Sequence, residues 1–278
     1  MYKTLVSVDT LAAHLDAPNW LVVDCRFDLA NPSAGEQAFA QAHIPGAVYA
    51  HLDRDLAAPI TPTTGRHPLP EPDAFAAKLG AWGVGADTQV VAYDNDVGMY
   101  AARLWWMLRW LGHEAVAVLD GGFKAWTAAG MKTSAEIATR APQTFVARPN
   151  RSLWADAREV AERAHDPAWR VLDARAPERF RGEVEPIDPV AGHVPGARNH
   201  PFAWNVSEGR FAPAEEIRRR FEASQGGVSD ARTIAMCGSG VTACHLLLAM
   251  EVAGKPGGRL YPGSWSEWIR DPTRPIEK

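Results

Sequence analysis

Short apolar runs of strand length alternate with helical patterns along the whole chain. The strand-like runs are LVVD at 21–24, VVAYD at 90–94, AVAVLD at 115–120, RVLDA at 170–174, TIAMC at 233–237 and RLYP at 259–262. Residues 101–112 and 242–254 carry apolar positions at helical spacing, and each segment ends in a glycine, Gly112 or Gly254, which suits a helix C-terminus. Strands that alternate with helices predict a parallel sheet covered on both faces. The pattern therefore predicts an α/β fold.

The same pattern occurs twice, with an offset of about half the chain. The matched blocks are WLVVDCR at 20–26 with WRVLDAR at 169–175, HIPGA at 43–47 with HVPGA at 193–197, VVAYDNDVGMYAARLWW at 90–106 with TIAMCGSGVTACHLLLA at 233–249, and DGGFKAW at 120–126 with PGSWSEW at 262–268. Four blocks in the same order predict two copies of one domain. Residues 133–152 lack a clear period and contain Pro142 and Pro149, which is typical of an extended linker. We expect one domain over residues 1–137, a linker over 138–152 and a second domain over 153–278.

Composition and charge exclude several classes of protein. The chain has 278 residues, of which 46% are hydrophobic and 22% charged, as in ordinary soluble globular proteins. A net charge of −4 gives no reason to expect nucleic acid or an anionic membrane surface as a partner. No apolar run is long enough to span a bilayer, and the first residues, MYKTLVSVDTLAAHL, lack the pattern of a secretory signal. With an odd number of cysteines, Cys25, Cys237 and Cys244, these features lead us to expect a reducing, cytoplasmic location.

Cys237 lies at the predicted carboxyl end of a strand, where ligands bind in parallel sheets. The residue aligned with it in the first half is Asp94. A charged residue in one copy predicts that the position faces out of the core in both. This favours a reactive thiol over a small buried hydrophobic residue.

The loop after Cys237 has the composition of an anion-binding turn. Gly238 and Gly240 can adopt positive φ, so successive backbone N–H groups can point toward one centre. The helix that begins near Thr242 adds the positive end of its dipole. Both effects favour the thiolate, which is the nucleophilic form of cysteine. Ser239 and Thr242 offer hydroxyl donors, with helix capping as the alternative role.

Such a loop suits three reactions: phosphoryl transfer, sulfur transfer through a persulfide, and redox signalling. Cysteine phosphatases need an arginine in this loop to clamp the phosphate with two hydrogen bonds. None of residues 238–243 is basic, which argues against phosphatase chemistry. No CxxC pair, His/Cys ladder or glycine-rich nucleotide motif is present either, so neither a metal nor a nucleotide is expected.

These features together resemble the tandem-domain rhodanese-type sulfurtransferases. The resemblance rests on HIPGA and HVPGA, on an aspartate where the other copy has cysteine, on CGSGVTAC and on PGSWSEW, and it covers nearly the whole chain. The loop CGSGVTA is similar to that of the 3-mercaptopyruvate subgroup, whereas thiosulfate enzymes typically carry basic residues where Gly238 and Ser239 stand here. The resemblance implies two rhodanese-like domains, each a mainly parallel sheet flanked by helices, with the catalytic cysteine in the second.

The family implies a two-step reaction with a covalent intermediate. Cys237 takes sulfur from a small anionic donor, 3-mercaptopyruvate being favoured, and becomes a persulfide. A thiol, thioredoxin or cyanide then accepts the sulfur, without a metal or organic cofactor, nucleic acid or membrane. A thiosulfate:cyanide sulfurtransferase and a persulfide carrier for a protein partner stay as alternatives.

The resemblance also implies roles for individual residues. The catalytic set would be Cys237, Ser239 and His43, because the family pairs the loop serine with a histidine and an aspartate. Asp28 is a candidate for that aspartate. A turn-capping histidine is the alternative for His43, since His193 holds the same place in the second copy.

Donor binding is assigned to one arginine and to the loop. Arg179, in PERFRGEVEP, matches the arginine that binds the donor carboxylate, and its planar fork suits that group. Arg66, in TGRHPLP, could steer an anion, with its neighbour His67. Ile187 stands where a second substrate arginine is expected, which leaves room for thiosulfate or another donor. The loop residues assigned to donor binding are Gly238, Gly240, Val241 and Thr242.

Overall fold

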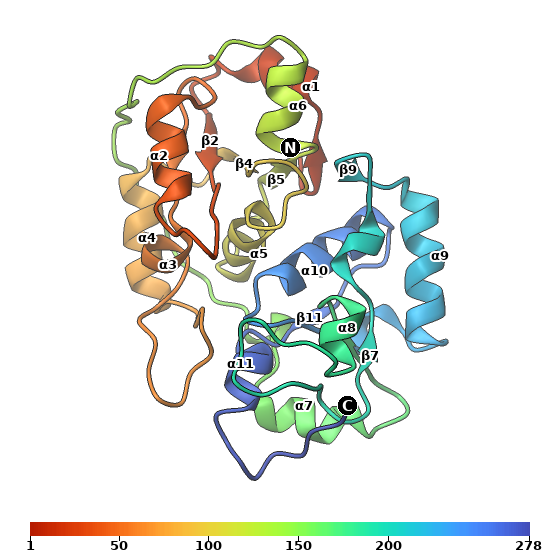
Figure 1. The fold of residues 1–278 in the computed structure, drawn as a ribbon. Coiled ribbons are helices and arrows are strands. Elements are labelled where there is room, and N and C mark those ends of the chain that lie inside the picture. The colour runs from red at the N-terminus through yellow and green to blue at the C-terminus, as the bar shows by residue number, and fades with distance from the viewer. The chain divides into compact units, whose positions relative to one another are not determined.

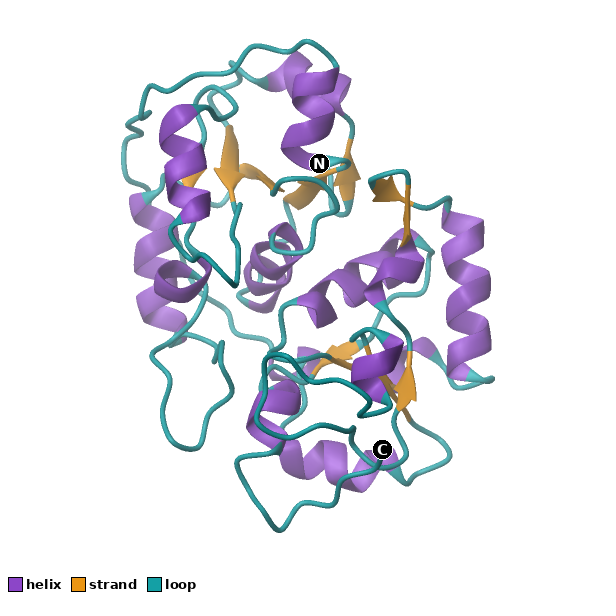
Figure 2. Cartoon of the chain, in the orientation of Figure 1, coloured by secondary structure: helices purple, strands orange, loops and turns teal.

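A computed structural model describes residues 1–278, and the chain divides into two compact units (Figures 1 and 2). The first unit comprises Met1–Ala58, Leu69–Asn150 and Glu208–Phe211. The second unit comprises Pro59–Pro68, Arg151–Ser207 and Ala212–Lys278. Both are α/β units built on a parallel sheet, as the alternating pattern predicts.

The first unit holds a five-stranded sheet in the order β1-β5-β4-β2-β3, with every pair parallel. Its strands are β1 (Leu5–Val6), β2 (Trp20–Asp24), β3 (Val48–Tyr49), β4 (Gln89–Tyr93) and β5 (Val116–Leu119). Its helices are α1 (Val8–His14), α2 (Ala34–Gln41), α3 (Leu52–Asp55), α4 (Pro72–Ala81), α5 (Ala101–Trp110) and α6 (Gly122–Ala128).

Both faces of this sheet are buried. On one face, alternate strand residues such as Trp20, Val22 and Val91 pack with apolar residues of α1, α2 and α6. Helix α5 packs on β4 and β5, whose remaining side chains are also buried. Because neither face meets water, the strands are apolar at successive positions rather than alternate ones.

The second unit holds a four-stranded parallel sheet in the order β11-β10-β6-β7. Its strands are β6 (Arg170–Asp173), β7 (Arg198–Asn199), β10 (Thr233–Met236) and β11 (Arg259–Leu260), with β8 (Val206–Ser207) as a further short strand. The short strand β9 (Arg210–Phe211) is grouped with the first unit. The helices of the second unit are η1 (Arg151–Leu153), α7 (Ala157–Ala164), α8 (Pro177–Phe180), η2 (Phe202–Asn205), α9 (Ala214–Gln225), η3 (Asp230–Arg232), α10 (Thr242–Val252) and α11 (Ser264–Trp268). Helices α7 and α11 contribute Val160, Trp265 and Trp268 to the core of one face, while α10 packs on β10 and β11.

The repeated sequence blocks fold into repeated contacts. Strands β2 and β6 each end in an aspartate, Asp24 or Asp173. A buried arginine two residues later, Arg26 or Arg175, binds that aspartate with an N···O distance of 2.6 Å in both units. The same arginine donates to a backbone carbonyl just before the histidine of the next block, at 2.7 Å in one unit and 2.8 Å in the other. The expected glycine stops are also present, because Gly112 and Gly254 have φ of 86° and 69° just after α5 and α10.

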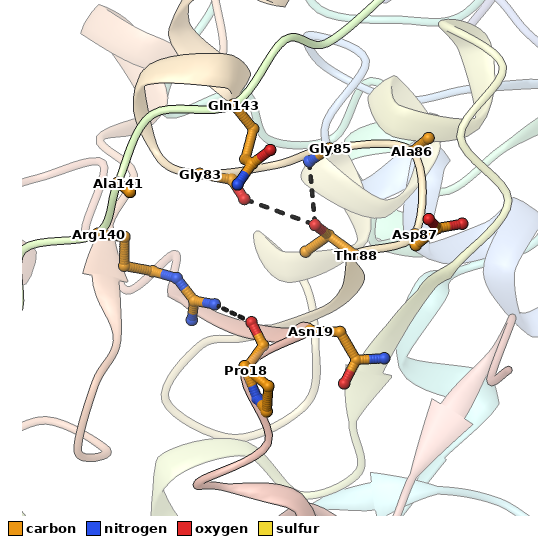
Figure 3. A pocket seen from close by; sticks show the side chains of 10 residues that line it. All are labelled: Pro18, Asn19, Gly83, Gly85, Ala86, Asp87, Thr88, Arg140, Ala141 and Gln143. Atoms are coloured by element: carbon orange, nitrogen blue, oxygen red, sulfur yellow. Dashed lines mark hydrogen bonds between the residues drawn. The ribbon is translucent and has the colours of Figure 1, made fainter.

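The boundary between the units differs from the expected linker. Residues 138–150 belong to the first unit. Arg140 donates to the carbonyls of Trp20 (2.6 Å) and Pro18 (2.8 Å). Arg140 and Gln143 line a pocket of this unit (Figure 3). The segment is extended, as its prolines suggest. Its backbone is held against α4, because the N–H of Gln143 donates to the carbonyl of Gly80 at 2.9 Å. Residues 59–68 lie instead with the second unit. No helix of the structure combines the length and the apolar character that crossing a membrane would require.

Candidate active site

Cys237 is the first residue after β10, at the carboxyl edge of the second sheet. Its backbone is held by the first two residues of α11. Its N–H donates to Ser264 Oγ at 3.0 Å, and its carbonyl accepts from the N–H of Trp265 at 3.0 Å. The Cys237 side chain therefore leaves a fixed point of the main chain.

The loop after Cys237 turns back on the sulfur. The N–H of Gly240 donates to Cys237 Sγ at 3.1 Å, and Gly240 has φ of 77°. A Cβ at Gly240 would lie 2.3 Å from the carbonyl of Pro262, so both the conformation and the space require glycine there. Gly238, in contrast, does not take the positive φ expected of it; its missing side chain leaves room for arginines.

The first unit shows what the same loop does with an anion. Asp94 Oδ1 accepts from the N–H groups of Asp96 and Gly98, and Oδ2 accepts from those of Tyr100 and Ala101, at 2.7–3.2 Å. Burial raises the pKa of Asp94, while these backbone hydrogen bonds act in the opposite direction and favour the carboxylate. The repeated loop is therefore an anion cradle, and Asp94 fills it in the first unit.

The expectation that this position faces out of the core is wrong for both units. Cys237 and Asp94 are each only 2% exposed. A charged group can be buried here because backbone N–H groups, rather than water, satisfy it. The other two cysteines, Cys25 and Cys244, are also buried, and Cys244 Sγ donates to the carbonyl of Gly240.

Ser239, the second residue of the loop, has a histidine partner from a distant part of the chain. Its Oγ lies 2.7 Å from His67 Nδ1, and both side chains are buried. His67 belongs to residues 59–68, which accompany the second unit. The structure therefore corrects the expected pairing: the histidine beside Ser239 is His67, not His43.

His43 lies in the first unit with both ring nitrogens on backbone carbonyls. Nδ1 is 2.7 Å from the oxygen of Phe39, and Nε2 is 3.0 Å from that of Glu136. Its counterpart His193 makes the same kind of contact, since its Nδ1 lies 2.7 Å from the oxygen of Phe180. Each ring also stacks on that phenylalanine. This matching geometry is typical of a histidine that caps a turn, and Asp28, proposed as its partner, accepts instead from the N–H of Ala30.

Two arginines converge on the first loop residue. A Cβ built on Gly238 would lie 2.9 Å from Arg66 Nη2 and 3.7 Å from Arg179 Nη2. The backbone of Arg66 is fixed there because its N–H donates to Ser266 Oγ at 3.0 Å, and the N–H of Ser266 donates to the carbonyl of Gly238. Arg66 and Arg179, expected from separate motifs, thus lie beside the same residue of the cysteine loop.

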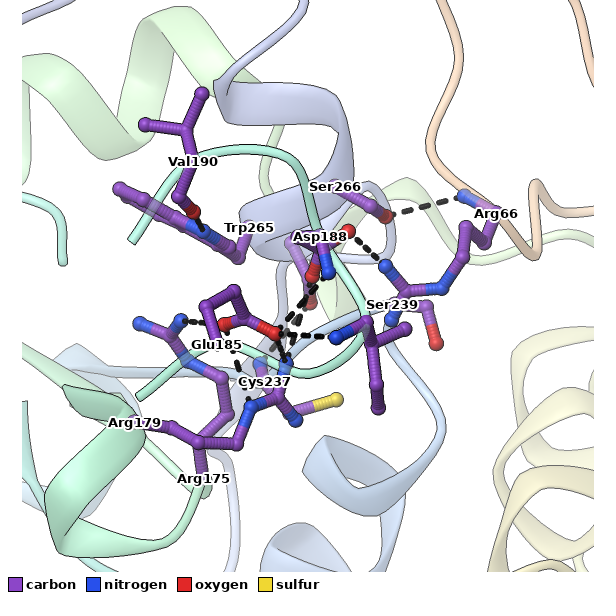
Figure 4. Close-up of polar contacts among 12 residues, drawn as sticks. Arg66, Arg175, Arg179, Glu185, Asp188, Val190, Cys237, Ser239, Trp265 and Ser266 are labelled. Carbon is purple, nitrogen blue, oxygen red and sulfur yellow. Dashed lines mark hydrogen bonds and ion pairs between the residues drawn. The ribbon is translucent and has the colours of Figure 1, made fainter. Parts of the chain in front are cut away.

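Both arginines are bound by acidic residues that the sequence interpretation missed. Asp188 pairs with Arg66 through Oδ1 and with Arg179 through Oδ2, and Figure 4 shows its carboxylate between the two forks. Glu185 accepts from Arg179 Nη2 at 2.6 Å. Burial raises the pKa of Asp188 and Arg66 acts in the opposite direction, while the hydrogen bond from Arg179 helps to lower the pKa of Glu185 against the effect of burial.

The signal that could have revealed these acids is the stretch EPIDP itself. It carries two carboxylates just after Arg179, where one more arginine is expected. Ile187, which takes that place, is 45% exposed, and its N–H donates to Glu185 Oε1 at 3.1 Å. Val241 is buried and Thr242 begins α10, so these two loop residues border the cradle from the helix side.

Comparison with known proteins places this geometry in a family. The model of the rhodanese-like domain matches residues 7–129 and again residues 156–271. A Pseudomonas aeruginosa protein named "Probable 3-mercaptopyruvate sulfurtransferase" is 51% identical over 275 residues, which cover 98% of this chain and 97% of that protein. The thiosulfate sulfurtransferase of Bos taurus is 36% identical over 281 residues, covering 97% and 93%.

A solved structure superposes on both domains of this chain together. The crystal structure of SseA from Escherichia coli, described as a 3-mercaptopyruvate sulfotransferase of rhodanese fold, superposes with a TM-score of 0.84 at 33% identity. The superposition covers 96% of this chain and 100% of that one. The chain therefore belongs to the rhodanese-like family, as a sulfurtransferase built of two such domains.

Proposed function

We propose that this chain moves a sulfur atom from a small anionic donor, 3-mercaptopyruvate being favoured, to a thiol-type acceptor through a persulfide on Cys237. The observation that carries the proposal is the anion cradle. The loop that binds the Asp94 carboxylate through backbone N–H groups is repeated after Cys237, where the N–H of Gly240 donates to the sulfur. A cradle of this kind favours negative charge on sulfur, both before attack and on the persulfide afterwards.

The reaction balances without an external oxidant. The thiolate of Cys237 attacks the sulfur of the donor, and the new S–S bond forms as the C–S bond of 3-mercaptopyruvate breaks. The electron pair of that bond stays on carbon as an enolate, which takes up one proton to give pyruvate. An acceptor thiolate then attacks the outer sulfur and leaves as its own persulfide, which restores Cys237.

Ser239 and His67 are placed to serve the proton steps. Ser239 lies on the loop that holds Cys237, and its Oγ is 2.7 Å from His67 Nδ1. A proton can therefore pass between the sulfur donor and the imidazole of His67 through the Ser239 hydroxyl. Arg179 and Arg66, beside Gly238, are the groups to bind the donor's carboxylate. Because Cys237 is 2% exposed, the donor reaches it only when side chains around the loop move aside.

Intact-mass measurement after incubation with each donor tests the proposal. We expect one added sulfur on the wild-type chain, located on Cys237 by peptide mapping, and none on the Cys237→Ser variant. Cys25→Ser is the matched control, because Cys25 is a buried cysteine of the first unit, and it should load like the wild type. Loading that persists in Cys237→Ser would refute the site.

Two other functions remain candidates because the donor and the acceptor are separate questions. Thiosulfate as the main donor is supported by the identity to the thiosulfate enzyme of Bos taurus. A carrier would load sulfur but release it slowly to small thiols. Steady-state rates with 3-mercaptopyruvate and thiosulfate, each with cyanide and a small thiol as acceptor, separate the three.

A further inference from the structure

The charges around the Cys237 loop form a closed network rather than an open positive pocket. Three guanidinium groups are matched by three carboxylates: Arg66, Arg175 and Arg179 with Asp173, Glu185 and Asp188. Arg175 forms an ion pair with Asp173 at the end of β6, with an Nη2···Oδ2 distance of 2.6 Å. Arg66 and Arg179 lie beside Gly238, and these two arginines are called the anion clamp of the site.

Asp188 is the one carboxylate that contacts both arginines of the clamp. Its Oδ1 binds Arg66, and its Oδ2 lies 3.5 Å from Arg179 Nη2. The two arginines come from residues 59–68 and from α8, so the carboxylate joins segments that are more than a hundred residues apart in the sequence.

Asp188 is also held in place by its own neighbours. It is 8% exposed, and its N–H donates to Glu185 Oε1 at 3.1 Å. Glu185 is in turn fixed by Arg179, at 2.6 Å. The negative charge of Asp188 is therefore a built part of the clamp and cannot swing away into solvent.

We propose that Asp188 is a specificity-determining residue, which makes the clamp select singly charged α-keto carboxylates over doubly charged donors such as thiosulfate. A clamp of two arginines alone would carry two positive charges and suit a dianion. With Glu185 on Arg179 and Asp188 against both forks, the positive charges of the two arginines are matched, and each negative charge on a donor lies close to a buried carboxylate, so a dianion is disfavoured more than a monoanion. Like charges at such short range and low exposure are strongly unfavourable.

This inference rests on the proposed function, because it concerns donor binding beside Cys237, but binding can be measured without turnover. The probes are pyruvate, an α-keto monoanion, and sulfate, a dianion, titrated calorimetrically at low ionic strength. We expect the wild-type protein to bind pyruvate more tightly than sulfate. In Asp188→Asn the ratio of sulfate affinity to pyruvate affinity should rise on the order of 10-fold, and the ratio of kcat/KM for thiosulfate to that for 3-mercaptopyruvate should rise with it.

Two variants control for loss of structure and for general charge effects. Asp188→Glu keeps the charge and should keep the wild-type preference. Glu183→Gln removes a charge from the same loop, but Glu183 is exposed and pairs with Arg181, so both ratios should stay within about 2-fold of the wild type.

The outcomes separate the two proposals. Wild-type protein that prefers sulfate, or a folded Asp188→Asn variant with an unchanged ratio, overturns the role of Asp188 even if Cys237 still loads sulfur. Failure of Cys237 to load sulfur from any donor refutes the proposed function, whatever the anion titrations show. If Asp188→Asn does not fold, wild-type protein that binds sulfate at least as tightly as pyruvate still overturns the inference.

Discussion

Ser239 and His67 are 172 residues apart in the sequence and 2.7 Å apart at the site. The histidine of the HIPGA block looked like the partner because it belongs to a recognisable motif. The repeat gives the physical reason against it, since His43 and His193 have the same kind of turn-capping contact in both units, whereas only the second unit has a cysteine in the loop. We therefore expect His67, and not His43, to take part in sulfur transfer.

Paired histidine variants test this assignment at the residue scale. His67→Asn should slow transfer on the order of 100-fold with a changed pH profile, because Ser239 loses its proton partner. His43→Asn should lower the free energy of unfolding by about 1–3 kcal/mol, because it breaks buried hydrogen bonds, and leave kcat/KM of the folded protein nearly unchanged. Steady-state kinetics and urea unfolding of both variants provide the comparison, and equal loss of activity in the two would contradict it.

The elements of the fold follow from the sequence to a large extent. The runs at 21–24, 90–94 and 233–237 coincide with β2, β4 and β10, because a strand buried on both faces must be apolar throughout. The repeat also located the cysteine loop. The acids at 185 and 188 and the partner of Ser239 could not be located, since they come from irregular segments whose path is set by tertiary contacts rather than by periodicity.

The first residue of α11, Ser264, has a strained backbone conformation. Ser264 has φ of 52°, an unfavourable value for a residue with a Cβ, and its counterpart Gly122 has φ of 57°. Ser264 Oγ accepts from the N–H of Cys237 at 3.0 Å and donates to the carbonyl of Tyr261 at 2.9 Å. The second unit thus has serine where the first has glycine, and the hydroxyl holds the cysteine backbone.

Substitution of Ser264 separates strain from hydrogen bonding. Ser264→Ala keeps the strain and loses both hydrogen bonds, so the free energy of unfolding should fall by about 1–3 kcal/mol. Ser264→Gly loses the same bonds but relieves the strain, so its loss should be about 1 kcal/mol smaller. Both should slow sulfur loading of Cys237, measured by quenched mass spectrometry. An alanine variant as stable as the glycine variant would show that the strain is not significant.

For the molecule as a whole, buried histidines make stability depend on pH. Burial lowers the pKa of His200 to about 4. Its ring stacks on Phe221, with nitrogens 2.8 Å from Ser224 Oγ and 3.1 Å from Asn205 Oδ1. The unfolded chain binds a proton at this residue near pH 6.5, whereas the folded chain does so only near pH 4, so stability is complete above pH 6.5 and falls as the pH drops toward 4.

The His200→Gln variant isolates this contribution. The wild type should lose up to roughly 3 kcal/mol more than the variant between pH 7 and pH 4, from the difference between the two pKa values. Urea unfolding at several pH values measures the difference between the two proteins, in which the titration of all shared groups cancels. Parallel pH curves for wild type and variant would contradict the assignment.

The carboxylate of Asp94 also limits what the duplicated scaffold can carry. It occupies its own cradle with hydrogen bonds to four backbone N–H groups, and it is part of the covalent chain. The first unit therefore has no vacancy for a transferable atom, in any solution condition that keeps it folded. Although the architecture is doubled, the proposed function gives each polypeptide the capacity for a single sulfur, and a second sulfur would require replacement of Asp94 in the first cradle.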